Sequence, residues 1–162
     1  MTHIKRLNEN FNPDEYTKDN NKPLKELVGS VIKDGVYVSA FAKTDKQNSP
    51  SLTDKGVYTN FDKRFLEDWS NGATNLVPVK YLKNVPDGIE IYEIYVKHPN
   101  DKYFYEIGYL LVKDGSPLIM TQGPGDPRGC FITRKGELIV SGHDGNYIFD
   151  IDNPENFDRF TW

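Results

Sequence analysis

The residues of this chain best suited to chemistry cluster in one short segment. Residues 142–146 read Gly-His-Asp-Gly-Asn and bring together His143, Asp144 and Asn146. A metal site would need further ligands at a compatible spacing, and the downstream glycine and glutamate of a calcium loop are missing. The pattern favours a hairpin turn, in which glycine supplies a positive φ and aspartate bonds its own backbone. His143 and Asp144 are candidate binding residues, and we expect no metal.

The most unusual segment is residues 123–129, which read Gly-Pro-Gly-Asp-Pro-Arg-Gly. Its glycines and prolines predict a stiff, shaped loop that presents Asp126 and Arg128 as charged groups. Loops on rigid sheets often carry function. Two interpretations stay open: a binding loop that uses Asp126 and Arg128, or a wide hairpin closed by an Asp–Arg pair.

The remaining reactive side chains do not form a catalytic motif. Cys130 and His143 could act as nucleophile and base only if the strands brought them together, and a single cysteine in a strand is more often a small core residue. Glu90 and Glu93 lie three apart in a predicted strand and so point to opposite faces, whereas Glu106 stands among apolar neighbours. Neither a Gly-x-Ser-x-Gly elbow nor a phosphate loop is present. We expect no catalytic residues and no cofactor.

The first third of the chain predicts helices and short strands. A proline after a cap residue predicts a short helix near 13–18, and apolar residues spaced by three and four predict a second helix that Pro23 opens and Gly35 ends. A strand follows at 36–41, then a polar loop at 43–56, a strand at 57–61 and a helix that ends near Trp69. Residues 76–81 predict a strand or a strand-to-helix step, and Pro78 within it favours a sheet edge.

From Ile89 onward the pattern is that of strands. Residues 89–96 and 103–112 are rich in aromatic and β-branched side chains, and 113–116 is a hairpin signal. Shorter strands at 117–121, 130–133, 137–141 and 146–151 complete an antiparallel meander. Pro154 is placed to open a last helical turn.

These elements predict a single α+β domain over residues 1–162, with two or three short helices toward the N-terminal half. A helical or irregular lead-in covers 1–34, a mainly antiparallel sheet with one inserted helix covers 35–152, and a C-terminal tail covers 153–162. Tyr92 and Tyr95 belong to the aromatic strands, and they serve as binding residues only if they are exposed.

Composition narrows the classes of function. The net charge is −4 and aromatic residues make up 13% of the chain, which argues against a nucleic-acid binder and against disorder. No apolar run is long enough for a membrane span, and the N-terminus lacks the pattern of a signal peptide. The single cysteine fits a reducing compartment, so we expect a cytoplasmic protein.

Residues 24–106 resemble the N-terminal domain of the SseB-type (serine-sensitivity-enhancing) family. The resemblance rests on a leading helix followed by 36–38, 57–59, a helix ending at Trp69, then 76–82 and 98–101. It implies a compact α+β domain without established catalysis, found in bacterial secretion and toxin-neutralising contexts. The later strands, with a Gly-rich loop and then Gly-Glu-Leu-Ile-Val at 136–140, are similar to the second half of small bacterial immunity proteins of the knr4/SMI1 type.

A third resemblance points to a different class of function. Residues 35–39, 92–97 and 122–125 follow the order found in the tuberculosis-necrotizing-toxin type of NAD glycohydrolase. That resemblance implies an enzyme acting on a nucleotide, although the family's Asp-Arg-aromatic-Gly motif and its later arginine are missing from this sequence.

Together these observations favour a non-enzymatic domain that binds another protein. Acidic charge steers a basic partner, and tyrosine and tryptophan are frequent anchors of interfaces. An immunity or inhibitor protein that neutralises a basic toxin or effector is the leading hypothesis. A nucleotide-acting enzyme and a small-ligand sensor, both using the 123–129 loop, are the alternatives.

Overall fold

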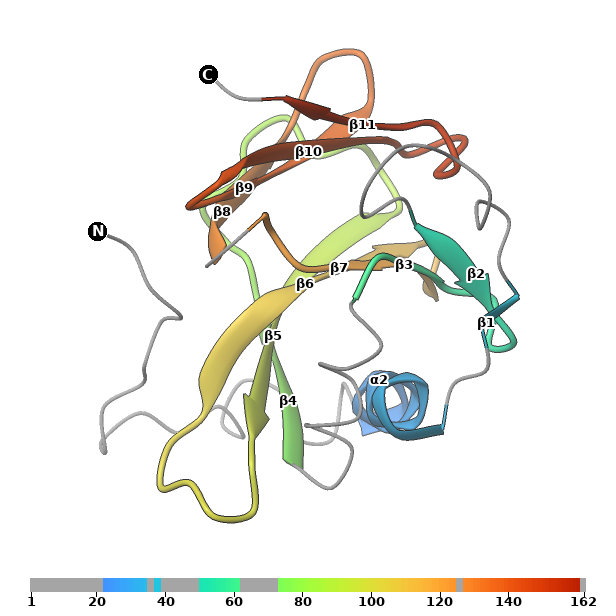
Figure 1. Cartoon of the computed structure of the whole chain (residues 1–162). Coiled ribbons are helices and arrows are strands. Elements are labelled where there is room, and N and C mark those ends of the chain that lie inside the picture. The colour runs from blue at the N-terminus through green and yellow to red at the C-terminus, as the bar shows by residue number, and fades with distance from the viewer. Residues whose placement is uncertain (1–21, 35–36, 39–49, 62–72, 125–126, 161–162) are drawn as a thin grey trace.

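The computed structural model describes residues 22–34, 37–38, 50–61, 73–124 and 127–160 (Figure 1). The helix of the described chain is α2 (Lys22–Asp34). The strands are β1 (Tyr37–Val38), β2 (Ser51–Thr53), β3 (Tyr58–Thr59), β4 (Ala73–Pro78), β5 (Ile89–Lys97), β6 (Tyr105–Lys113), β7 (Ser116–Thr121), β8 (Pro127–Ile132), β9 (Glu137–Gly142), β10 (Gly145–Asp150) and β11 (Phe157–Phe160).

The strands form two sheets. The first has seven strands in the order β1-β2-β3-β7-β6-β5-β4, and the second has four in the order β11-β10-β9-β8. Every neighbouring pair is antiparallel except β3 and β7, which run parallel with Tyr58 beside Ile119. The described part of the chain is thus a mainly antiparallel α+β structure, as the sequence predicts.

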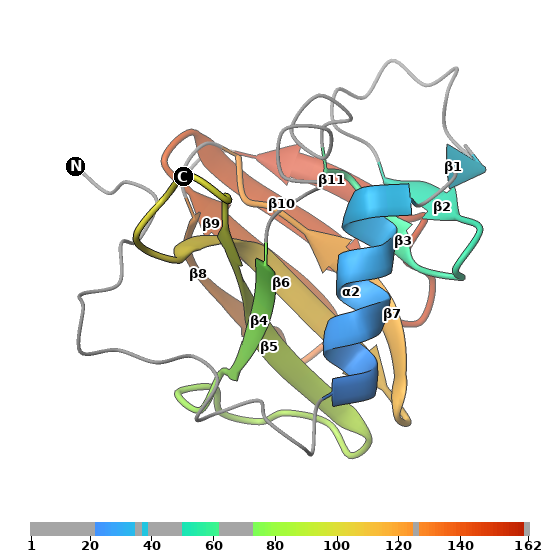
Figure 2. The ribbon, with the colours of Figure 1, turned by 90° about the horizontal axis from the view of Figure 1, so that it is seen from below.

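The helix and the two sheets are arranged in three layers. Figures 1 and 2 show α2 against one face of the seven-stranded sheet and the four-stranded sheet against the other face. One apolar cluster lies between α2 and the large sheet, and it includes Leu76, Ile94 and Leu110. A second lies between the two sheets around Tyr109 and Phe149. The long strands β5 and β6 are therefore largely buried on both faces.

The packing of α2 follows from its sequence. Apolar residues recur at spacings of three and four, so they share one face of the helix. On that face Val28, Val31 and Ile32 are buried, with Leu24 and Leu27 packed against the same cluster. The predicted helix after Pro23 is confirmed.

The two sheets are joined where the chain leaves β7 and enters β8. Gly123 lies so close to Ser141 that an added Cβ would stand 2.9 Å from the Ser141 carbonyl oxygen. A Cβ on Gly142 would overlap the backbone of Pro124. The Asp144 N–H donates to the Pro124 carbonyl at 2.8 Å. The predicted wide hairpin is therefore wrong, because the Gly-Pro segment crosses between sheets and β7 and β8 do not pair.

Several other predictions have clear outcomes. Residues 76–81 were expected at an edge, and β4 is indeed the last strand of the large sheet. The meander divides after β7, so its last strands form a sheet of their own. The helical turn expected after Pro154 is wrong, because β11 forms there by pairing with β10. Part of the expected 43–56 loop is strand β2.

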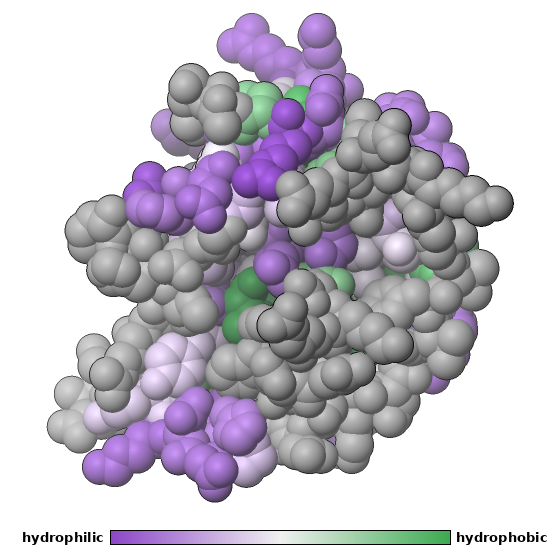
Figure 3. All heavy atoms as spheres, in the orientation of Figure 1, coloured by the Kyte–Doolittle hydropathy of each residue, from purple (hydrophilic) through white to green (hydrophobic). Residues whose placement is uncertain are grey.

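Two or three helices were expected, and one of them, α2, lies in the described residues. The helices expected near 13–18 and ending near Trp69 lie outside those residues. The surface view in Figure 3 shows hydrophilic side chains over the β5–β6 turn at the lower left. That distribution matches a solvated turn at the end of two strands that are otherwise buried.

The close sheet crossing predicts opposite effects for two glycine-to-alanine changes. We expect Gly142→Ala to destabilise the fold by about 1–3 kcal/mol, because its methyl group would meet the Pro124 backbone, which cannot move aside cheaply. Gly29→Ala, in α2 with no atom nearer than 3.9 Å, should be neutral or stabilise by up to about 1 kcal/mol. Urea unfolding of both variants measures the difference. Equal stabilities would contradict this account of the crossing.

Candidate functional site

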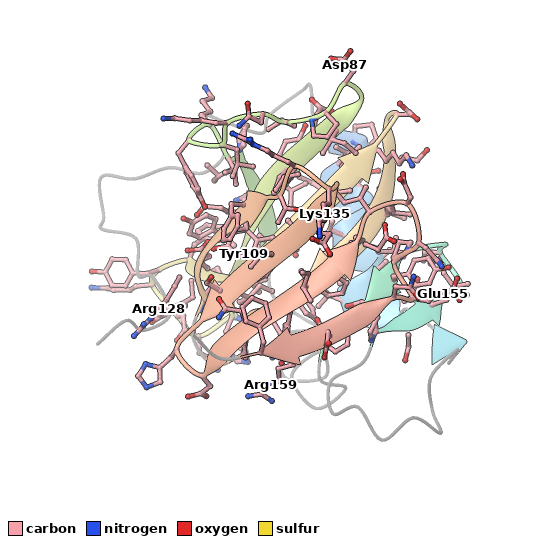
Figure 4. All side chains as sticks on the ribbon, turned by 90° about the horizontal axis from the view of Figure 1, so that it is seen from above. Asp87, Tyr109, Arg128, Lys135, Glu155 and Arg159 are labelled. Atoms are coloured by element: carbon pink, nitrogen blue, oxygen red, sulfur yellow. The ribbon has the colours of Figure 1, made fainter. Side chains whose placement is uncertain are left out.

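The turn between β9 and β10 brings two predicted binding residues together. Arg128 is the second residue of β8. Its Nη2 lies 3.1 Å from Nδ1 of His143, and both side chains are exposed. The neighbouring Asp144 is held through its backbone, since its N–H bonds Pro124 and its carbonyl accepts from Arg159 Nη2 at 3.3 Å. Arg128, His143 and Asp144 thus lie around one turn, as Figure 4 shows for Arg128 and Arg159 at that end of the sheet. Asp126 lies outside the described residues.

Tyr92 and Tyr95 cannot serve as surface anchors, which corrects their prediction as binding residues. Tyr92 is 5% exposed and packs in the cluster on the α2 side. Tyr95 is 1% exposed and packs with Val77 and Phe104. The two rings point to opposite faces of a sheet that is covered on both, so the aromatic richness of β5 belongs to the core.

Cys130 and His143 do not form a catalytic pair. The Cys130 side chain is buried between the sheets, where its Sγ lies 3.8 Å from the Tyr81 hydroxyl, and its N–H donates to that hydroxyl at 3.3 Å. Burial raises the pKa of the Cys130 thiol to about 12, so the nucleophilic thiolate is scarce at neutral pH. His143 instead contacts Arg128 on the surface.

Two carboxylates of β5 and β6, Glu93 and Glu106, lie beside buried tyrosines. Register places Glu93 beside Tyr109 and Glu106 beside Tyr95, and Glu106 is 2% exposed. Burial raises the pKa of Tyr95 and of Tyr109, and the charge of Glu106 raises both further. Glu90 is exposed, as expected of a solvated charge. These tyrosines stay protonated and do not supply a base.

The outer face of the four-stranded sheet has an apolar row across its centre, which the sequence analysis missed. Phe131 of β8 faces Ile139 of β9, Ile139 faces Ile148 of β10, and Ile148 faces Asp158 of β11. The alternate residues of these strands pack inward in the cluster between the sheets. Phe131 is 40% exposed, Ile148 is half-buried, and Ile139 between them is 6% exposed. We call Phe131, Ile139 and Ile148 the outer apolar row.

A hollow of about 460 Å³ lies at one end of this row. Ile148 and Phe157 supply its apolar lining, and Glu137, Asp150 and Asp158 supply three carboxylates. Among the described residues, no basic side chain lines it. Residues 150–158 contain four acidic residues and no basic one, although Asp152 pairs with Lys113 at 3.2 Å and Arg159 follows in β11. Figure 4 looks onto this face of the sheet and labels Glu155, which lies in the turn before β11.

A signal for this row was present in the sequence. Residues 138–140 are Leu-Ile-Val, an unbroken apolar run in a strand that was expected to have one solvated face. Such a strand should alternate between apolar and polar residues. Ile139 broke the alternation, but only the pairing of β9 with β8 and β10 shows that Phe131 and Ile148 lie beside it.

In the described part of the chain, no three His, Cys, Asp or Glu side chains come together as a metal site. Nor does that part contain a helix with the length and apolar character to cross a membrane. Comparison with known proteins adds no relative: no family model, curated protein or solved structure gives a significant match to this chain.

The buried tyrosines and cysteine predict a loss of stability at alkaline pH. Burial raises the pKa of Tyr95, Tyr109 and Cys130, so the unfolded chain releases these protons first as pH rises. The free energy of unfolding is therefore unaffected by these groups below about pH 9, and above it falls by at most about 1.4 kcal/mol per pH unit for each group. Urea unfolding from neutral to alkaline pH measures the slope. Tyr109→Phe should flatten it, and an unchanged slope in that variant would contradict the assignment.

Proposed function

We propose that this chain is a protein-binding domain that uses the outer face of the four-stranded sheet. The outer apolar row carries the proposal. In an antiparallel sheet with one face on the core, the other face is normally polar. Here Phe131, Ile139 and Ile148 lie side by side on that outer face. An apolar patch with a polar rim is the usual form of an interaction surface.

The chemistry of the rim indicates the partner. Three carboxylates line the hollow beside Ile148, and the whole chain carries a net charge of −4. A partner segment with basic side chains flanking an apolar one would place its apolar group on the row and its charges on the carboxylates. Such complementarity speeds association and selects against acidic partners. A basic toxin or effector, neutralised by being bound, fits this surface.

The arrangement of reactive groups favours binding over catalysis. Cys130 is buried with a raised pKa and His143 contacts Arg128, so the two are not placed to act as nucleophile and base. The side chains that line the hollow beside the row are carboxylate, amide and apolar groups, which suit the binding of charge and apolar surface.

The test uses short labelled peptides of defined chemistry and the full chain. We expect an alternating Lys-Leu peptide to bind, measured by fluorescence anisotropy. Lys-Ser and Glu-Leu peptides of the same length should bind at least about tenfold more weakly, because each lacks one half of the complementarity. Equal binding of the Lys-Leu and Glu-Leu peptides would contradict the proposal.

Matched variants locate the surface. Phe131→Ser and Asp158→Asn should each weaken the Lys-Leu peptide several-fold. Val85→Ser and Asp87→Asn likewise replace an exposed apolar residue by serine and an exposed aspartate by asparagine, away from the row, and should leave binding unchanged. Thermal unfolding of each variant separates lost binding from lost folding. The site assignment fails if the two pairs of variants behave alike.

A further inference from the structure

A buried polar cluster lies where β3 and β7 end, away from the outer apolar row. These two strands are the parallel pair among the described strands, so both leave the sheet at the same end. Asn60 follows β3, Thr121 ends β7, and Gln122 follows it just before the Gly-Pro crossing. The carboxyl ends of neighbouring parallel strands are a frequent place for ligands, because the two chains diverge there.

Hydrogen bonds fix the Asn60 side chain in one orientation. Its Oδ1 accepts from Thr121 Oγ1 at 2.8 Å and from the Gln122 N–H at 3.3 Å. A backbone N–H can only donate, so the carbonyl end of the amide must face it. The NH2 end of Asn60 therefore points away from these partners. Asn60 is 7% exposed and Thr121 fully buried, which makes the arrangement rigid.

The cluster leaves one donor and one acceptor without a partner. Asn60 Nδ2 and Gln122 Oε1 are both buried, and neither has a hydrogen bond within the described residues. Buried polar atoms in native proteins are almost always satisfied, by protein, by water or by a ligand. An orphan donor and an orphan acceptor on two hydrogen-bonded residues are complementary to a group that carries an acceptor beside an N–H.

We propose that this cluster binds a small planar ligand with an acceptor next to an N–H donor, the pattern of a primary carboxamide or of a nucleobase edge. The ligand acceptor would take the N–H of Asn60 Nδ2, and its N–H would donate to Gln122 Oε1. Phe61 and Met120, the chain neighbours of the cluster, are buried apolar residues that can contact a ring. Gln122 is partly exposed, so its flexible side chain lies within reach of the surface and can admit a ligand.

The first test observes the two side-chain amides directly. In a ¹⁵N-labelled full chain, benzamide should shift the side-chain NH2 signals of Asn60 and Gln122 in a saturable way. N,N-dimethylbenzamide lacks the donor, and benzoate lacks it too, so both should bind at least about tenfold more weakly. Adenine in place of benzamide distinguishes a nucleobase edge from a carboxamide. Asn75, whose Oδ1 is an isolated orphan in β4, should not shift.

Variants and one crystallographic observation complete the test. Asn60→Asp keeps the acceptor for Gln122 and Thr121 but loses the donor, and Gln122→Met removes the acceptor at similar size. Each should weaken the bound probe at least about tenfold, whereas Asn75→Asp should not. If a variant fails to fold, the probe series on the unchanged protein decides. The proposal is overturned if no probe shifts either amide, if benzoate binds as well as benzamide, or if a crystal shows only a bridging water that benzamide does not displace.

Discussion

The fold depends on one close contact between backbones, where the chain crosses from the large sheet to the small one. Gly142 lies against Pro124 with no room for a Cβ, and Gly123 lies almost as close to Ser141. Hydrogen bonding of Asp144 to Pro124 fixes the distance. Because the crossing is so short, the four strands that follow must lie over the large sheet. Their inward residues then build the cluster around Tyr109 and Phe149.

That constraint also decides which groups are available to solvent. Covering both faces of β5 and β6 removes Tyr92, Tyr95 and Glu106 from the surface. The small sheet packs one face on the core, and its other face is turned outward. The outer apolar row lies there because β8, β9 and β10 pair in that register.

Local patterns were sufficient to predict single elements. The 3–4 spacing in α2 and the proline in β4 are local signals, and both gave the correct element and its place. The Gly-Pro segment shows where such signals stop being sufficient. Its residues suit a hairpin and a crossing between sheets equally well, because both need tight backbone turns. The crossing forms because Gly142, in strand β9 of the second sheet, packs against Pro124.

The candidate residues show the same limit. Arg128 and His143 were expected at loops and do meet, because the register of β8 with β9 places Arg128 beside the turn. The exposure of Tyr92 and Tyr95 could not be predicted, because strand alternation assigns each residue to a face of the sheet but does not show which element covers that face. A bulge between Ile94 and Tyr95 shifts the register with β6 as well, and no local rule in the sequence marks it.

Burial and function are linked through the titratable groups. A thiol or phenol in the core keeps its proton, since desolvation raises the pKa, and this is the state of Cys130 and Tyr109. Such groups stabilise packing but cannot exchange protons near neutral pH. Glu137, Asp150 and Asp158, in contrast, line the hollow on the outer face of the small sheet. The proposed binding role uses these carboxylates and the apolar row beside them, and it needs no proton transfer from Cys130 or Tyr109.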